Sequence, residues 1–252
     1  MIERSFAAFV LLLLGLAFHL LPSESACPRV CDLALGAYYV TPQVNLSYIA
    51  PLFGVPDYND LIPYNRDIKN PNSILSGSRV HVYFSCDCIN GDFLGHNFSY
   101  VVVKGDTYDT IAKQVYANLT TAASLAHFNS FPETNVPVGA TIGVIVNCSC
   151  GDEAVSKDYG LFETYPLLPG ENLSSVAAAY NFSSQEDLLQ RYNPGADFNA
   201  GTGVVFIPTK DPSDSYRPLS QRRNETKNRV ELGQLLYGVY PMLDAKAHNR
   251  SI

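Results

Sequence analysis

Carboxylates, histidines and cysteines are the residues of this sequence whose chemistry could support catalysis. A glycosidase needs two carboxyl groups held about 5–10 Å apart across a cleft. The neighbouring acids here fall on expected turns and helix starts, where acids commonly cap helices; they are Asp106/Asp109, Asp152/Glu153 and Glu186/Asp187. The histidines outside the N-terminal segment form neither an HExxH nor a Ser–His–Asp signature; they are His81, His96, His127 and His248. We predict that the chain is not an enzyme.

The six cysteines form three close pairs, which could bind zinc or form disulfides. The pairs are Cys27 and Cys31, Cys86 and Cys88, and Cys148 and Cys150. Zinc knuckles favour two to four residues between ligands, so a Cys-x-Cys spacing fits zinc poorly. Residues one apart on an extended segment point in opposite directions, so each member of such a pair should bond a different partner. We predict disulfides, no metal and no cofactor, although the spacing selects no connectivity.

The N-terminus and the glycosylation acceptors both indicate export. Residues 1–25 are predicted to be a secretory signal peptide: Arg4 precedes an apolar stretch, and Ser23 and Ser25 suit a cleavage site. Exported proteins fold in an oxidising compartment, where disulfides persist. Most of the Asn-x-Ser/Thr acceptors are expected to be glycosylated, although Asn147 lies between candidate core and cysteine positions. The acceptors are Asn45, Asn97, Asn118, Asn147, Asn172, Asn181, Asn224 and Asn249.

Composition narrows the classes of partner. The 252 residues are 46% hydrophobic and carry a net charge of −7, which suits a folded protein but not one that binds nucleic acid. Beyond the signal peptide we find no apolar run of about 18 residues, so we predict no membrane span and no GPI-type tail. There is no Trp, so aromatic contacts with a ligand must come from Tyr or Phe.

Two sequence markers recur at regular intervals. An aromatic-Asn pair occurs at 64–65, 128–129 and 192–193, each 64 residues from the last. A glycine that leads a strand-like run occurs at Gly77, Gly139 and Gly201, each 62 residues from the last. Matching periods in independent markers indicate repeated modules.

The third repeat shows the expected element order most clearly. A strand at 162–168 is followed by a helix capped by Asn172. A capping box formed by Ser183 and Glu186 is expected to open a second helix. A strand at 204–207 closes the repeat, which gives the order strand, helix, helix, strand.

The other two repeats follow the same order less clearly. In the second we expect strands at 98–103 and 141–146, a helix capped by Asp106 or Thr107, and a second helix beginning at Thr120 or Thr121 and reaching 128. In the first we expect strands at 38–40 and 80–82. Its helix around 46–53 contains Pro51, which should kink or shorten it.

This pattern resembles the LysM domain, and three copies separated by Cys-x-Cys pairs resemble plant LysM receptor ectodomains. Four runs are similar to the chitin elicitor receptor kinase group, which includes the legume Nod-factor receptor kinases. They are GDFLGHNFSY (91–100), YANLTT (116–121), NCSCGD (147–152) and LQRYNPG (189–195). The resemblance covers 27–219 and implies an α+β fold of three βααβ LysM modules packed into one unit by three disulfides.

The expected organisation follows from this resemblance. It is a signal peptide (1–25), a degenerate first LysM module (26–88), a second (89–150), a third (151–210), and a linker with a disordered tail (211–252). The resemblance further implies the disulfides Cys27–Cys88, Cys31–Cys150 and Cys86–Cys148.

The resemblance also implies binding of N-acetylglucosamine oligomers, chiefly by the second LysM module. Carried onto this sequence, one wall of the groove comprises Gly105, Asp106, Thr107, Tyr108 and Asp109, and the other comprises Glu133, Thr134, Asn135 and Val136. Loop amides can bond the acetamido group, and Val136 and the Tyr108 ring can cover its methyl. Gly105 and Glu133 depart from the family pattern, which bears on affinity and oligomer length. Pattern alone favours a helix cap for Thr107 and a core aromatic for Tyr108.

The resemblance implies extracellular binding of chitin oligosaccharides in plant immune or symbiotic perception. Relatives continue into a membrane span and a kinase, which this sequence lacks. We interpret it as a receptor ectodomain, or as a secreted truncated form acting as a soluble binder or decoy. A long oligomer could bridge two copies or a LysM co-receptor. The alternatives are a co-receptor interaction module that binds no sugar, and a Nod-factor (lipochitooligosaccharide) binder.

Overall fold

The computed structural model describes residues 27, 29–133, 135–210 and 219. The predicted signal peptide, almost all of the predicted tail, and the acceptors Asn224 and Asn249 lie outside the described residues. The strands form one six-stranded sheet in the order β4-β3-β2-β1-β5-β6. The strands are β1 (Cys31–Tyr39), β2 (Arg79–Ile89), β3 (Phe93–Val101), β4 (Thr141–Asn147), β5 (Leu161–Pro166) and β6 (Val204–Thr209).

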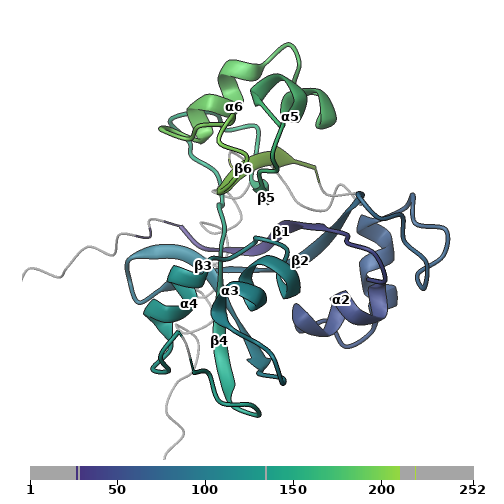
Figure 1. The fold of residues 1–252 in the computed structure, drawn as a ribbon. Helices are drawn as coiled ribbons and strands as arrows, with labels where there is room; N and C mark the ends of the chain where they lie inside the picture. The colour runs from purple at the N-terminus through teal and green to yellow at the C-terminus, as the bar shows by residue number, and fades with distance from the viewer. Residues whose placement is uncertain (1–26, 28, 134, 211–218, 220–252) are drawn as a thin grey trace, which may run out of the picture.

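Two short helical segments lie between the two strands of every repeat, as the sequence predicts (Figure 1). The first repeat has α2 (Leu46–Leu52) and the 3-10 helix η1 (Tyr58–Tyr64). The second has α3 (Tyr108–Thr110), which continues as the π-helical turn η2 (Ile111–Val115), and then α4 (Ala122–Phe128). The third has α5 (Leu173–Ala179) and α6 (Glu186–Tyr192).

Several boundaries differ from the sequence prediction. The residues of strand β2 alternate between buried and partly exposed as far as Cys86, so this part has one face on the core. The strand runs on to Ile89 because its last three residues pair with β3. The capping box at Ser183 is wrong: α6 has Gln185 at its N-cap, without a side-chain cap. Pro51 lies inside α2, which ends one residue later, but α2 has seven residues like α4, α5 and α6, which contain no proline. The expected shortening is therefore not seen.

The same amide bridge occurs in all three repeats. The side chain of Asn65, Asn129 or Asn193 lies between the end of the second helix and the closing strand. Each Nδ2 donates to the carbonyl of the leucine four residues earlier, at 2.8, 2.9 and 2.8 Å. Each Nδ2 also donates to the carbonyl of one residue of the closing strand, and the N–H of that residue donates back to the asparagine Oδ1. In the three repeats this strand residue is His81, Gly143 and Phe206. The bridge explains why the aromatic-Asn marker recurs.

The first and second repeats share one hydrophobic core, whereas the third has its own. Phe53, at the end of α2, stands edge-on to Tyr38 of its own repeat and to Phe98 and Tyr116 of the second. Edge-on aromatic pairs add to the stabilisation from burial. The first two repeats therefore form one packed unit. The third repeat, with α5 and α6, lies at the top of Figure 1, apart from the helices of the other two.

The three disulfides are those that the family resemblance implies: Cys27–Cys88, Cys31–Cys150 and Cys86–Cys148. Each member of a Cys-x-Cys pair bonds a different partner, as predicted. Residues 151–210 contain no cysteine. Cys27–Cys88 lies within the first repeat, whereas Cys31–Cys150 and Cys86–Cys148 join the first repeat to the second and hold the point where the chain enters the third.

A strand pairing and a buried carboxylate attach the third repeat to the first. Strand β5 lies parallel to β1, with Glu163 opposite Leu35. The Glu163 side chain is fully buried, accepts a hydrogen bond from the Tyr180 hydroxyl at 2.6 Å, and lies 2.5 Å from Nδ1 of His81 on β2. Because a buried carboxylate is costly without partners, the junction depends on both contacts.

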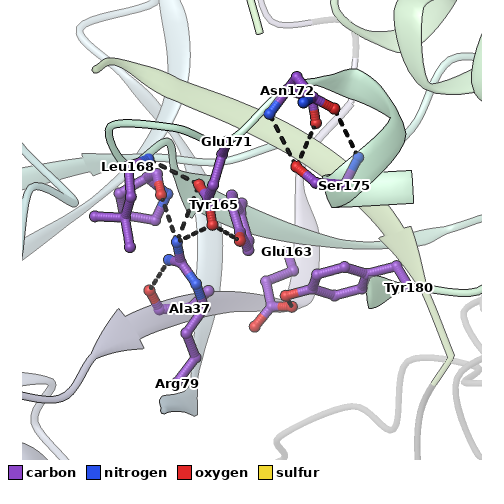
Figure 2. A network of polar contacts seen from close by, with 10 residues as sticks. Ala37, Arg79, Glu163, Tyr165, Leu168, Glu171, Asn172, Ser175 and Tyr180 are labelled. Atoms are coloured by element: carbon purple, nitrogen blue, oxygen red, sulfur yellow. Dashed lines mark hydrogen bonds and ion pairs between the residues drawn. The ribbon is translucent and has the colours of Figure 1, made fainter. Parts of the chain in front are cut away.

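Arg79 of β2 makes a second cross-repeat contact (Figure 2). Its guanidinium donates to the carbonyl of Pro166 at 2.9 Å and pairs with Glu171 at 3.2 Å. It also lies 3.6 Å from the centroid of the Tyr165 ring. The positive charge is thus shared between a carboxylate and an aromatic face of the third repeat.

We expect the amide bridge to be a principal source of stability in each repeat. Asn193→Asp keeps the shape but replaces two donated hydrogen bonds with repulsion between oxygens. It should lower the free energy of unfolding by about 2–4 kcal/mol, measured by thermal or urea unfolding. Asn199→Asp, the same change at an exposed turn position, should cost less than about 0.5 kcal/mol. Equal losses would contradict this role.

The His81–Glu163 contact predicts a pH dependence. Burial lowers the pKa of His81, but attraction and a hydrogen bond from Glu163, with a smaller contribution from Asp67, outweigh burial and the opposing Arg79. The net pKa lies above the ordinary value of about 6.5. Its contribution to stability is therefore complete below that value and is lost as pH rises through the folded-state pKa.

The stability of the junction should accordingly be greater at about pH 5.5 than at about pH 8. His81→Gln should flatten the pH dependence of the unfolding midpoint. His127→Gln, at an exposed position of α4, should leave it unchanged. A pH dependence that survives His81→Gln would count against this assignment.

Candidate functional site

The first predicted wall is the loop between β3 and α3, and Asp106 shapes it. Its carboxylate accepts the N–H of Val103 at 2.7 Å and the hydroxyl of Tyr100 at 2.8 Å. Burial, and then the hydrogen bond to Asp106, raise the pKa of Tyr100, which keeps its hydroxyl a donor. The Asp106 side chain is therefore committed to the loop.

Gly105 occupies the exposed tip of this loop. Its φ is +98°, a conformation that side chains disfavour, although a Cβ would meet open space. Its backbone N–H and C=O form no hydrogen bond within the described part of the chain. Gly105 thus offers an exposed backbone donor and acceptor to a ligand.

Thr107 caps α3, as the pattern predicts. Its hydroxyl accepts the N–H of Thr110 at 3.1 Å, and the Thr110 hydroxyl accepts the N–H of Thr107 at 2.8 Å, which completes a capping box. Asp109 is exposed and pairs with Lys113 at 2.7 Å. The helix start therefore has a fixed geometry, and the charge of Asp109 is partly balanced.

Tyr108 joins the two walls. Its side chain is 1% exposed, as expected for a core aromatic, and its hydroxyl donates to the carbonyl of Phe131 at 3.2 Å. Burial raises the pKa of Tyr108, a backbone hydrogen bond to Phe131 opposes this, and the carboxylate of Glu133 adds to the rise. Tyr108 thus connects the two walls from a buried position, and little of its ring is exposed.

The second wall follows α4. The N–H of Asn135 donates to the carbonyl of Pro132 at 3.0 Å, which closes a turn, and Val136 after it is 8% exposed. Glu133 and Asn135 are exposed. The predicted site residue Thr134 lies outside the described residues.

The structure brings the described residues of both walls to one end of the second repeat. Strands β3 and β4 pair from Gly95–Asn147 to Val101–Thr141, and beyond them the N–H of Val102 donates to Ala140. Sequence reasoning missed the supporting residues Tyr100, Thr110 and Phe131. Their signal was in the third repeat, where Tyr165 and Glu171 repeat the Tyr100–Asp106 contact 65 residues later.

The glycosylation acceptors lie mostly at the surface. Asn147 is exposed at the end of β4, despite its position between core and cysteine residues. Asn45 and Asn172 cap helices through Oδ1, which leaves Nδ2 for a glycan. The remaining described acceptors are exposed; they are Asn97, Asn118 and Asn181.

The one set of described residues grouped like metal ligands is already bonded. The sulfur atoms of Cys31, Cys86 and Cys150 lie within 4.8 Å of one another, but all three belong to disulfides and offer no thiolate. Within the described ranges, every helix is too short or too polar to cross a membrane.

Comparison with known proteins defines the class of these modules. The LysM domain family matches residues 163–208, and the LYK3/4/5 LysM2 domain family matches residues 93–146. The chain is 46% identical to chitin elicitor receptor kinase 1 of Arabidopsis thaliana, over 89% of this chain and 37% of that protein. It is 39% identical to LysM domain receptor-like kinase 3 of Medicago truncatula, over 87% of this chain and 36% of that protein.

Solved structures narrow the class to a family. The ectodomain of a receptor-like kinase superposes with a TM-score of 0.72 at 48% identity, covering 77% of this chain and 99% of that one. The LYK3 ectodomain also gives 0.72, at 41% identity, covering 77% and 97%. The chain belongs to the LysM receptor-like kinase family and corresponds to its ectodomain. It spans little more than a third of the length of the curated relatives named above.

We expect the Tyr108 hydroxyl to hold the second wall in place. Tyr108→Phe should lower the free energy of unfolding by about 0.5–1.5 kcal/mol and speed amide hydrogen exchange over 131–136. Tyr116→Phe removes a matching bond, to the carbonyl of Leu52 at 3.2 Å, and should leave exchange over 131–136 unchanged. If both variants affect those amides equally, Tyr108 has no special part in the site.

Proposed function

We propose that this chain binds chitin oligosaccharides (N-acetylglucosamine oligomers) outside the cell. The site is the groove between 105–109 and 133–136 in the second repeat. The role is plant immune or symbiotic perception, as a receptor ectodomain or a soluble form. Family membership and the name of the Arabidopsis relative support the sugar class.

The observation that carries the proposal is that hydrogen bonds fix the shape of the two walls, while Gly105, Glu133 and Asn135 remain exposed. Asp106 and Thr107 are used to set the loop, so ligand contact falls to the exposed backbone at Gly105 and to the side chain of Asn135. An acetamido sugar is neutral and presents one N–H, one C=O, hydroxyls and a methyl group. Backbone amides match its polar groups, and Val136, at the base of the second wall, contacts the methyl.

Glu133 adds a carboxylate at the rim, close enough to act on the pKa of Tyr108. A carboxylate accepts hydrogen bonds from sugar hydroxyls without requiring a charged ligand. We assign to Glu133 an effect on affinity and oligomer length, and not on the class of sugar.

A long oligomer exposes the same acetamido pattern at several positions. It can therefore bridge two copies of this ectodomain, or one copy and a LysM co-receptor, and avidity would then favour longer chains. In a full-length receptor, such bridging would bring two kinase domains together.

Isothermal titration of the glycosylated protein with chitohexaose tests the proposal directly. A cello-oligosaccharide of equal length, which lacks acetamido groups, should give no heat of binding. Val136→Asp should weaken chitohexaose binding at least tenfold, or about 1.4 kcal/mol. Val138→Asp makes the same change at a position that is 66% exposed on the same loop, and should bind like the unmutated protein.

Two outcomes would overturn the proposal. If the unmutated protein binds no chitin oligomer, the module is one that contacts a co-receptor without sugar. If only a lipochitooligosaccharide binds, the ligand is a Nod factor. Thermal unfolding of Val136→Asp separates a lost contact from a lost fold.

A further inference from the structure

A hollow lies between the second and third repeats, away from the proposed binding site. It has a volume of about 680 Å³, within the range of small-molecule sites. The second repeat contributes the turn and helix start at 118–122, and the third contributes 167–169 and 201–204. None of the groove residues lines it. We call this hollow the inter-repeat cleft.

Two glycosylation acceptors line the inter-repeat cleft. Asn118 is exposed in the turn between η2 and α4, with φ of +64°. Asn147 is exposed at the end of β4, where its carbonyl accepts the hydroxyl of Thr164 of the third repeat at 2.6 Å. Sugars attached to either side chain would begin inside the cleft.

Thr120 is the third residue of the Asn118 acceptor sequence, and the fold does not explain its hydroxyl. The residue is 7% exposed and lines the cleft, yet its Oγ1 has no hydrogen-bond partner within the described residues. A buried hydroxyl without a partner costs free energy that valine, of nearly the same shape, would avoid. The glycosylation sequence Asn118-Leu119-Thr120 does require a hydroxyl at this position.

The lining of the inter-repeat cleft suits sugar. Leu168 and Pro169 offer an apolar surface, which can cover the C–H face of a pyranose ring. Thr121, Ser124 and Thr202 offer hydroxyls to its rim. A covalently attached sugar also has a high effective concentration in the cleft and needs little intrinsic affinity.

We propose that the inter-repeat cleft holds the core sugars of N-linked glycans carried by Asn118 and Asn147. The glycans act there as a built-in ligand between two repeats that have separate hydrophobic cores. No disulfide links these two repeats through residues 151–210, because that segment contains no cysteine. They stabilise the packing of the third repeat on the second. This inference does not depend on the proposed function of the groove.

Three variants of the secreted, glycosylated chain test the proposal. Thr120→Val removes the Asn118 acceptor sequence, whereas Thr120→Ser preserves it. Ser183→Ala removes the acceptor at Asn181, which has a nearly identical φ of +61° in the equivalent turn of the third repeat but does not line the cleft. Glycopeptide mass spectrometry measures occupancy, and hydrogen exchange reports on 167–168 and 201–204.

We expect Thr120→Val to lose the Asn118 glycan and to raise exchange in those cleft segments severalfold. Thr120→Ser and Ser183→Ala should leave exchange there unchanged. The same comparison in unglycosylated protein from a bacterial periplasm controls for packing. There, Thr120→Val should unfold at the same or a higher temperature than the unmutated chain, because only the unpartnered hydroxyl is lost.

Three results would overturn the proposal. One is an unoccupied Asn118 in the secreted protein. Another is unchanged hydrogen exchange in the cleft segments both in Thr120→Val, which lacks the Asn118 glycan, and in the double variant with Ser149→Ala, which also lacks the Asn147 acceptor. The last is protection of these segments by free chitohexaose in the glycosylated protein, since an open cleft is incompatible with one already filled by its own sugars.

Discussion

The amide bridge made by Asn65, Asn129 and Asn193 is the contact on which each repeat depends. Within the described residues, the α-helices have seven residues or fewer, far below the length at which helices persist alone. They therefore need tertiary contacts at their ends. One asparagine provides them by bonding to both the helix and the closing strand. Neither aspartate nor leucine can replace it, because the bridge uses two donors and one acceptor of one planar group.

The two junctions between repeats follow different physical principles. The first and second repeats share one core and two disulfides, so their relative position is set by apolar packing and covalent bonds. The third meets the first through a short parallel strand pairing and polar side chains centred on Glu163 and Arg79. Polar junctions of this kind depend on pH and on the presence of every partner. The inter-repeat cleft lies elsewhere, between the second and third repeats.

The candidate groove shows how structural and functional roles divide within one loop. Asp106, Thr107 and Tyr108 are among the residues that we propose as the binding site, yet their side chains form the turn, the helix cap and the core link. The same residues shape the loop and leave the backbone at its tip exposed. A groove that binds through backbone needs no tryptophan and no net charge, which fits the composition of this chain.

Much of the fold followed from local pattern. The repeats, the order of their elements, the caps at Thr107 and Asn172, and the rule that each Cys-x-Cys pair has two partners came from spacing that the backbone imposes. The disulfide pairing came from family resemblance, because spacing alone leaves the connectivity open. The capping box at Ser183 was wrong: the chain turns at 183–184, but α6 begins only after Gln185, which makes no side-chain cap.

The sequence by itself determined that this is a three-module, disulfide-linked protein, since those properties depend on residue type and period. Only the tertiary structure decided which residues that are distant in the sequence come into contact. The pairing of β1 with β5, which makes the sheet continuous, joins residues 128 positions apart. The burial of Glu163 against His81, the use of Tyr108 as a link between walls, and the meeting of Asn118 and Asn147 at one cleft join residues that are 23 to 82 positions apart. Periodicity describes a face of one element, and it does not state which other element that face will meet.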